Sequence, residues 1–574
     1  MNLRTIALAA FCFSLVVPAV QSQTKTPQAD LIFIHGNIYT GVISPSSHKP
    51  ERVEAIAVHA GRIEATGTDE KVLRLKSPKT KVVDIGGHFL MPGFNDAHLH
   101  LADAGLQKLN LDVTGTKSLQ EFQDRLREKA RSTPAGTWIQ GGGWDDTLWP
   151  VKQLPTRADL DAVTKDHPVF LERVDGHIAI VNNLALQQAK IGKTTKDPDG
   201  GKIDRGPNDE PTGIIRETAM TLVENVIPPP SPQQRRAALE LALQDLAQSG
   251  ITSAQDYSPG SEQKPWENFE VFAALKREGK LTARISEWME FNLPLGMLQK
   301  YRSLPPQDSM LHTGMLKGFM DGSLGSHTAA LLEPYSDQPG KSGIPRYEQA
   351  RLTEMTKERL DAGFQIGFHA IGDKGVQMAL DAYAAAETQA HAKNVKAADG
   401  GNNYRLRIEH AQVTSPAQVA QFKELHVIAS MQPNHLLTDM RWAKARLGEN
   451  RAAHSYAWAE FLNAGVPLAF GTDYPVEPVA PFRGLYAAIT RKSEDGRMEY
   501  FPAERLNIDQ AIAAYTAGAA FAEFEEKQKG TLAPGMLADM VELDRDITAV
   551  PAKDILGTKV LCTIVGGKVV YKAK

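Results

Sequence analysis

Side chains that suit a divalent metal recur at the carboxyl ends of short apolar runs in this sequence. The recurring set is His98, His100, Lys317, His369, His410 and Asp473. Imidazole and carboxylate groups bind zinc and similar divalent ions. A single histidine beside a strand is more often a hydrogen-bonded core or surface residue. The hypothesis of a metal site therefore rests on the recurrence of one position, not on any one residue.

The pair His98 and His100 is the most compact part of this set. Side chains at positions i and i+2 of a strand point to the same side, so both imidazoles can face one site. The spacing His-x-His is weak evidence alone and gains weight from the other strand-end histidines. Asp473, in Phe-Gly-Thr-Asp-Tyr-Pro, could bind a metal and accept a proton from water. The alternative for Asp473 is an Asx turn before Pro475.

Eight strand-like apolar runs alternate with helical stretches between residues 91 and 473. They begin near Met91, Gly250, Ala283, Leu316, Phe364, Leu406, Val427 and Pro467. Repeated βα units in this number predict an α/β protein with a closed (β/α)8 TIM barrel, whose chemistry lies at the carboxyl ends of the strands. An open doubly wound sheet is the competing fold, but no Gly-x-Gly-x-x-Gly follows any of these runs.

The two ends of the chain predict a smaller domain. Residues 23–87 and 526–574 contain short β-type runs broken by turns, and we expect them to form one β-sandwich, because two unpaired strands would be marginal alone. The barrel is then predicted at 88–525. Within it, residues from about 101 to 230 are too many for one βα connection. We expect this insert to form a lobe over the barrel mouth.

Residues 1–22 are typical of a signal peptide. Arg4 precedes an apolar stretch, and cleavage is expected after Ser22, so the protein would be exported to a periplasm or the medium. A buried strand or a membrane anchor is the alternative. Only Cys562 would remain after cleavage, which excludes an internal disulfide.

The composition and charge argue against nucleic acid and an anionic membrane as partners, and we expect a small-molecule substrate instead. The 574 residues are 42% hydrophobic and 23% charged, which is typical of a globular protein. The net charge is −4, and no run of basic residues would follow a nucleic acid or an anionic membrane. We expect no membrane association after cleavage, and homo-oligomerisation stays open.

Several segments resemble a known group of enzymes. Leu90-Met-Pro-Gly-Phe-Asn-Asp-Ala-His-Leu-His resembles the first-strand signature of the amidohydrolase superfamily, and the segment from Gly530 to Asp544 is similar to its closing segment. Gly318-Phe-Met-Asp-Gly-Ser-Leu-Gly-Ser and His369-Ala-Ile-Gly-Asp resemble amidohydrolase family 3, which includes N-substituted formamide deformylases. The resemblance extends over nearly all of the mature chain. It implies a metal-dependent hydrolase that cuts carbon–nitrogen bonds other than peptide bonds, in amide or N-formyl substrates.

The resemblance also implies roles for two residues. Lys317 occupies the fourth-strand position at which superfamily members with two metals hold a lysine carboxylated by carbon dioxide. Burial near cations lowers the pKa of a lysine and exposes the neutral amine that carbon dioxide needs. The alternative is an exposed strand-end lysine. Asp473 matches the superfamily's general base, which returns a proton to the leaving nitrogen.

Four further residues are candidates from the same resemblance or from residue type. His177, in a loop similar to a family 3 segment that reaches the pocket, could polarise the substrate carbonyl or be a turn histidine. Asp321 could orient a ligand or cap the turn at Gly322. His327 stands where family 3 members often have Arg, and we expect it near the substrate. Trp144 could wall an apolar pocket, although aromatic residues are more often core.

The predicted mechanism is attack on an amide or formyl carbon by a hydroxide held on one or two metal ions, with Asp473 as proton shuttle. Zinc is the first choice, and iron, manganese or nickel would also accept this ligand set. The same scaffold could instead cut a lactone, a carbamate or an N-acyl amino acid, or deaminate a ring. A non-catalytic exported binder of metal or solute is a different class. A serine hydrolase is disfavoured, because no Gly-x-Ser-x-Gly segment is present.

Overall fold

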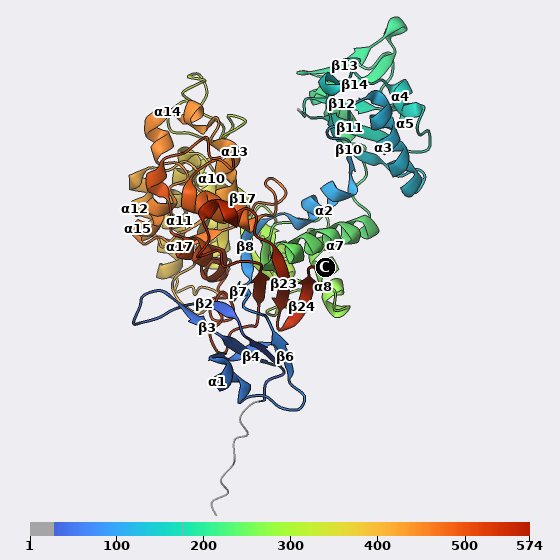
Figure 1. The fold of residues 1–574 in the computed structure, drawn as a ribbon. Coiled ribbons are helices and arrows are strands. Elements are labelled where there is room, and N and C mark those ends of the chain that lie inside the picture. The colour runs from blue at the N-terminus through green and yellow to red at the C-terminus, as the bar shows by residue number, and fades with distance from the viewer. Residues whose placement is uncertain (1–27, 175) are drawn as a thin grey trace, which may run out of the picture.

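The computed structural model describes residues 28–174 and 176–574, and in this part the centre is one sheet of eight parallel strands (Figure 1). Each strand pairs with its neighbour in chain order. The strands are β8 (Phe94–Leu99), β15 (Ile251–Asp256), β16 (Arg284–Glu290), β17 (Leu311–Phe319), β18 (Ile366–Ala370), β19 (Arg407–His410), β20 (Ile428–Met431) and β21 (Leu468–Phe470). Each of the eight predicted runs contributes one strand to this sheet, which confirms the predicted TIM barrel.

Backbone hydrogen bonds just beyond the ends of β21 and β8 bring the sheet close to full closure. The Asp473 N–H donates to the His98 carbonyl (2.8 Å), and the His100 N–H donates to the Tyr474 carbonyl (2.8 Å). The closure therefore places Asp473 directly beside the two histidines of the first strand.

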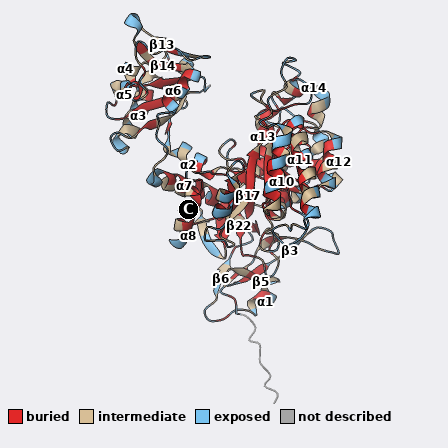
Figure 2. Cartoon of the chain, turned by 180° about the vertical axis from the view of Figure 1, so that it is seen from behind, coloured by how far each residue is buried: buried red, intermediate tan, exposed pale blue. Residues whose placement is uncertain are grey.

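Helices surround the barrel strands, and the helix at 433–439 lies at the mouth of the barrel. They are α7 (Pro232–Gln248), α8 (Glu267–Arg277), α9 (Leu295–Arg302), α10 (Gln349–Asp361), α11 (Asp373–Ala392), α12 (Pro416–Glu424), α13 (Pro433–Asp439), α14 (Ala443–Ala453), α15 (Trp458–Ala464), α16 (Pro481–Thr490), α17 (Ile508–Ala513) and α18 (Ala519–Ala522). Some begin at clear sequence signals: Ser415 and Gln418 form a capping box with Pro416 in the first turn of α12. Figure 2 shows buried residues on the strands and exposed residues on the outward helix faces.

Strands from both termini form the predicted small domain below the barrel (Figure 1). One sheet contains β1 (Leu31–Ile34), β4 (Ala55–His59), β5 (Arg62–Gly67) and β6 (Lys81–Asp84), with α1 (Asp69–Leu73) against it. The other contains β2 (Asn37–Ile43), β3 (Pro50–Val53), β7 (Phe89–Pro92), β22 (Met540–Leu543), β23 (Val560–Val565) and β24 (Lys568–Lys572), and α19 (Ala552–Ile555) lies between β22 and β23 in the chain. Both sheets bury side chains in one core that includes Ile38, Ile56 and Ile564, as in a sandwich.

The boundary between this domain and the barrel lies later than predicted. The run from Met91 to His98 is two strands, because β7 pairs with β2 and β22 in the sandwich and the barrel strand begins only at Phe94. Gly93 separates them, and a Cβ there would lie 2.2 Å from the Thr252 side chain. The change of domain therefore falls at a position that only glycine fits.

The predicted insert forms a separate lobe. Its six-stranded sheet has the order β13 (Gly201–Arg205), β14 (Pro211–Glu217), β12 (Ile178–Val181), β11 (Val169–Arg173), β10 (Ile139–Trp144), β9 (Leu111–Asp112), with helices α3 (Leu119–Ser132), α4 (Arg157–Asp161), α5 (Asn183–Gln188) and α6 (Thr221–Glu224). The connections to the barrel are α2 (Leu101–Leu109) and α7, which cross so closely that a Cβ on Gly105 would lie 1.9 Å from the Ala238 carbonyl oxygen.

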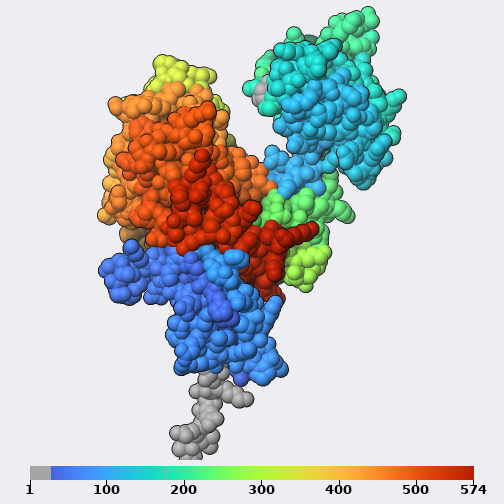
Figure 3. Space-filling model, viewed as in Figure 1, coloured from blue at the N-terminus to red at the C-terminus, as the bar shows by residue number. Residues whose placement is uncertain are grey.

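The lobe stands beside the barrel, not over its mouth as predicted. Figures 1 and 3 show it apart from the barrel, joined through α2 and α7. None of its described residues lines the cavity at the strand ends.

The predicted signal peptide, residues 1–22, lies outside the described residues. Among the residues described, no helix is both long and apolar enough to cross a membrane. Cys562 is buried in β23, where its neighbours are apolar.

Candidate metal centre

A cavity of about 400 Å³ opens at the carboxyl ends of the barrel strands. All six strand-end candidates line it, and one further histidine, His435, lies with them. The polar part of the lining contains His98, His100, Lys317, His369, His410, His435 and Asp473, and the apolar part contains Phe319, Leu324, Ile371, Trp442 and Val476. The chain therefore brings its predicted metal ligands to one place.

His98 is held by a carboxylate behind it. Its Nδ1 lies 2.8 Å from Glu409 Oε2, and the other carboxylate oxygen of Glu409 accepts from Arg407 Nε (2.8 Å). His98 Nε2 faces the cavity, 2.9 Å from Lys317 Nζ and 3.6 Å from Asp473 Oδ1. A carboxylate on the far nitrogen orients an imidazole and makes it a better metal ligand.

His100 is oriented in the same way by backbone. Its Nδ1 donates to the Tyr257 carbonyl (2.8 Å), which directs Nε2 to Asp473 Oδ1 at 3.1 Å. The rings of His98 and His100 lie 5.3 Å apart. As the period of a strand predicts, both imidazoles reach the same side of β8.

Asp473 lies between two imidazoles. Its Oδ1 contacts His100, and its Oδ2 lies 3.0 Å from His435 Nε2. Burial alone would raise the pKa of Asp473, but the hydrogen bonds from His100 and His435 lower it well below its usual range. The carboxylate is therefore ionised at neutral pH and can accept a proton.

Sequence reasoning missed His435. It lies in the first turns of α13, four residues beyond the last residue of β20, and not at the strand end where the other candidates lie. The available signal was Gln-Pro-Asn-His directly after the seventh strand, since Pro433 at the start of a helix marks where the chain turns.

Lys317 is fully buried at the floor of the cavity. Its Nζ lies 5.1 Å from the ring centre of Phe319 and 5.5 Å from that of Trp288. Burial lowers the pKa of Lys317 to about 8, although Glu409 and Asp473 act against this. An appreciable fraction of this side chain is therefore the neutral amine near neutral pH.

His369 and His410 complete the floor, with ring centres 4.4 Å apart. His369 Nε2 donates to the Gly322 carbonyl (3.1 Å). Burial lowers the pKa of His369 to about 3 and that of His410 well below its ordinary value, so both rings are neutral. His410 Nδ1 is buried with no hydrogen-bond partner among the described residues. A neutral imidazole with an unpaired buried nitrogen fits a metal ligand.

Two groups of donor atoms are close enough for a metal ion: His98, His100 and Asp473, and His410, His435 and Asp473. Within each group the atoms lie within 4.8 Å of one another. The described residues contain no other such group of histidine, cysteine and carboxylate side chains. The donor set, imidazole nitrogen with one carboxylate, suits zinc and other divalent transition metals.

Asp321 and His327 do not line the cavity. Asp321 is buried and accepts from the backbone N–H groups of Ala330, Ile371 and Gly372, at 2.8, 3.1 and 2.8 Å. It joins the loops after β17 and β18, and its Oδ1 lies 3.6 Å from Nε2 of His369. Its expected role in orienting a ligand stays a prediction. His327 Nε2 lies 3.1 Å from Asp337 Oδ1, so its partner is a side chain of its own loop.

Trp144 and His177 belong to the lobe and lie away from the cavity. Trp144 is fully buried in the lobe core, where its indole N–H donates to the Leu171 carbonyl (3.0 Å), so the core alternative replaces the predicted pocket wall. His177 is exposed, with Nδ1 3.1 Å from Glu217 Oε2. His177 does not line the barrel cavity in this structure, and its role in polarising a substrate carbonyl stays a prediction.

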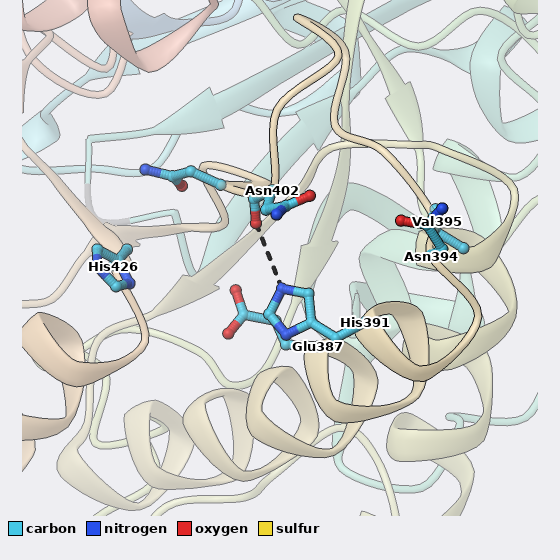
Figure 4. A pocket seen from close by; sticks show the side chains of 7 residues that line it. Glu387, His391, Asn394, Val395, Asn402 and His426 are labelled. Atoms are coloured by element: carbon cyan, nitrogen blue, oxygen red, sulfur yellow. Dashed lines mark hydrogen bonds between the residues drawn. The ribbon is translucent and has the colours of Figure 1, made fainter.

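A second cavity, of about 490 Å³, lies at the end of α11 (Figure 4). Glu387, His391 and His426 are among its lining residues, and His391 Nε2 donates to the Asn402 carbonyl (3.4 Å). These groups do not lie within metal-binding distance of one another. The chemistry therefore belongs to the cavity at the barrel mouth.

Known proteins share this sequence and fold. A model of the amidohydrolase family matches residues 81–571. Protein LONG AFTER FAR-RED 3 of Arabidopsis thaliana is 34% identical, over 95% of this chain and 92% of its own length. N-substituted formamide deformylase of Arthrobacter pascens is 25% identical, over 95% and 99%. The crystal structure of an uncharacterized metal-dependent hydrolase from Pyrococcus furiosus has a TM-score of 0.75 and 30% identity, over 90% of this chain and 99% of that one. As its motifs predicted, the chain belongs to the amidohydrolase family and is a metal-dependent hydrolase.

Proposed function

We propose that this protein hydrolyses a carbon–nitrogen bond, other than a peptide bond, in a small amide or N-formyl substrate. The observation that carries the proposal is Asp473, which has one oxygen beside His100 and the other beside His435 at the metal-ligand cluster. Hydrolysis needs a proton acceptor at this point, whereas a metal-storage or uptake site does not. The likeness to N-substituted formamide deformylase supports the type of bond.

The cluster is suited to a divalent metal, and we propose zinc. The residues that would hold it are His98, His100, His369, His410 and Asp473. When bound, a divalent ion activates water near neutral pH and polarises a carbonyl.

Asp473 would take the proton that the attacking water loses and deliver it to the leaving nitrogen. The water oxygen joins the carbonyl carbon, and the carbon–nitrogen bond breaks with its electron pair on nitrogen. The products are a carboxylic acid, which is formic acid for an N-formyl substrate, and an amine. Phe319 and Trp442 line the apolar side of the cavity, where they can hold the body of the substrate.

We also propose that Lys317 reacts with carbon dioxide. The neutral amine nitrogen bonds to the carbon of carbon dioxide and loses one proton, which leaves a carbamate anion. This step replaces a buried cation by anionic oxygen donors among the histidines. Its support is the complete burial of Lys317, its lowered pKa and its contact with His98.

We propose that the protein is exported. The support is the order of a basic residue, an apolar stretch and small polar residues in residues 1–22. Mass determination of the mature chain from the periplasm or medium tests this, and a chain that keeps Met1 in the cytoplasm would contradict it.

Turnover on a substrate panel tests the reaction. We expect amine release from N-formyl and N-acyl amines that stops after chelation and returns with zinc or manganese, with metal content measured on the same samples. Hydrolysis confined to lactones would keep the scaffold but overturn the bond class. Metal binding without hydrolysis of any class, including carbamates and ring amines, would support a non-catalytic binder.

A further inference from the structure

One carboxylate on the wall of the cavity has no role in the proposed mechanism. Asp439 is the last residue of α13, one helical turn after His435, so both side chains lie on the same face. It lines the cavity and is only 7% exposed. Its Oδ2 accepts from the Tyr456 hydroxyl (2.6 Å), while Oδ1 has no hydrogen-bond partner among the described residues.

The contrast with Glu477, the other acidic residue on this wall, shows what Asp439 lacks. Glu477 accepts from the Thr438 hydroxyl and from Arg483 (3.1 Å), so its charge is compensated. Arg483 forms an ion pair with Glu477 (3.1 Å). None of the described residues forms an ion pair with Asp439. Of the described residues that line the cavity, the only lysine or arginine is Lys317, on the floor.

A buried carboxylate without a cation is unfavourable unless something else compensates its charge. The pKa of Asp439 reflects this, since burial raises it to about 6 while His435 acts against the rise. At neutral pH the group is therefore mostly an anion that faces the cavity with one free oxygen.

Apolar side chains line the same cavity as Asp439. Trp442 follows α13 by three residues and lines the cavity with Leu324 and Val476. Gly325 lies against Trp442, and a Cβ at this glycine would be 3.4 Å from the indole ring. Arg446 lies over the Trp442 ring, 5.4 Å from its centre, and donates to the Gly325 carbonyl (3.0 Å).

We propose that Asp439 and Trp442 form a subsite for a positively charged nitrogen carried on an apolar or aromatic group of the substrate. This inference rests on the proposed function and narrows it: the substrate class is a cationic amide, such as an N-formyl or N-acyl derivative of a diamine. A charge-assisted hydrogen bond from the cation would satisfy Asp439 Oδ1. The same charge would repel substrates with a free carboxylate, which disfavours N-acyl amino acids.

The test is a binding measurement that does not depend on turnover. Calorimetry on the metal-loaded protein compares benzylguanidinium with benzylurea, which has nearly the same shape but no charge. We expect wild-type protein to bind the cation about 10- to 100-fold more tightly, as suits a hydrogen bond to a charged group. Asp439→Asn should lose most of this preference, because the amide keeps the size and an acceptor for Tyr456 but not the charge.

Two further variants locate the effect. Asp381→Asn, an exposed change on α11 with the same loss of charge, should keep the full preference. Equal binding of the two probes to wild-type protein would overturn the proposal, and this result does not depend on whether Asp439→Asn folds. A preference for the cation that is lost in Glu477→Gln but kept in Asp439→Asn would also overturn it. If the protein prefers the cation but hydrolyses none of the substrates, the subsite proposal stands and the proposed reaction is refuted. If it hydrolyses them but binds both probes equally, the proposed reaction stands and the subsite proposal is refuted.

Discussion

His435 and Asp473 meet across the mouth of the barrel, with His435 Nε2 3.0 Å from Asp473 Oδ2. The other oxygen of Asp473 faces His100 at 3.1 Å. One carboxylate therefore joins the first strand of the barrel to a helix that follows the seventh. This relationship makes His435 a positioning residue for the proposed proton acceptor.

Replacing His435 should lower turnover through Asp473. We expect His435→Ala to reduce kcat by about 10- to 100-fold, the usual cost of losing an outer partner of a metal-site ligand. His435→Asn, which can still donate a hydrogen bond, should recover part of the rate, and KM should change less than kcat. Equal rates in the Ala and Asn variants would contradict a positioning role, as would a loss seen only in KM.

Asp473→Asn should remove the proton acceptor but keep the size and one oxygen donor. General acid–base assistance contributes typically ~10²–10⁴-fold, so we expect a loss of that order in kcat with most of the metal retained. Turnover on the N-formyl and N-acyl panel and metal content should be measured on one sample, with Asp381→Asn as the control for lost charge. A variant that keeps its metal and runs within about twofold of wild type would refute the role.

The barrel could be predicted because each strand is a short apolar run, and the strand ends carry the polar groups. Parallel strands in a barrel all present their carboxyl ends at one mouth, so residues as distant in sequence as His98 and Asp473 had to meet. The apolar run that begins near Met91 is divided at Gly93 into a sandwich strand and a barrel strand, and apolar character alone could not predict this division. It depends on pairing of β7 with β2 and β22.

The missing parts of the site depend on tertiary contacts that no local pattern records. His435 reaches Asp473 from a helix, where no strand-end rule applies. Trp144 is equally aromatic whether it lines a pocket or fills a core, and its contact with Leu171 decides for the core. The lobe is joined to the barrel through α2 and α7, which cross closely at Gly105. His177 lies in this lobe and is not among the residues that line the barrel cavity.

Lys317→Ala tests the carbamate. If Lys317 carries a carboxylate bound through nitrogen, the variant should lose metal and activity together, and short carboxylic acids should restore part of both. Mass spectrometry under native conditions should show carbon dioxide on wild-type protein and not on the variant. Wild-type metal content and rate in Lys317→Ala would show that the residue is structural.

Glu387, in the cavity at the end of α11, should lower the stability of the fold at high pH. Burial raises its pKa to about 7, and the described residues provide it with no hydrogen bond or ion pair. The unfolded chain should ionise this group near the ordinary pKa of ~4.3. The folded state thus binds the proton more tightly, so its stability falls as pH rises from about 4 to about 7 and stays lower above that.

Glu387→Gln keeps the shape of the side chain and removes this pH dependence. We expect the variant to be more stable than wild type by up to about 3–4 kcal/mol at pH 8, as the rise of the Glu387 pKa from ~4.3 to about 7 implies, and by less at pH 5. Denaturant unfolding at both pH values measures the difference, and Glu424→Gln, an exposed change on α12, is the control. A gain of the same size at pH 5 and pH 8 would mean that packing, not ionisation of Glu387, is responsible, and no gain at pH 8 would show that this carboxyl ionises in the fold without penalty.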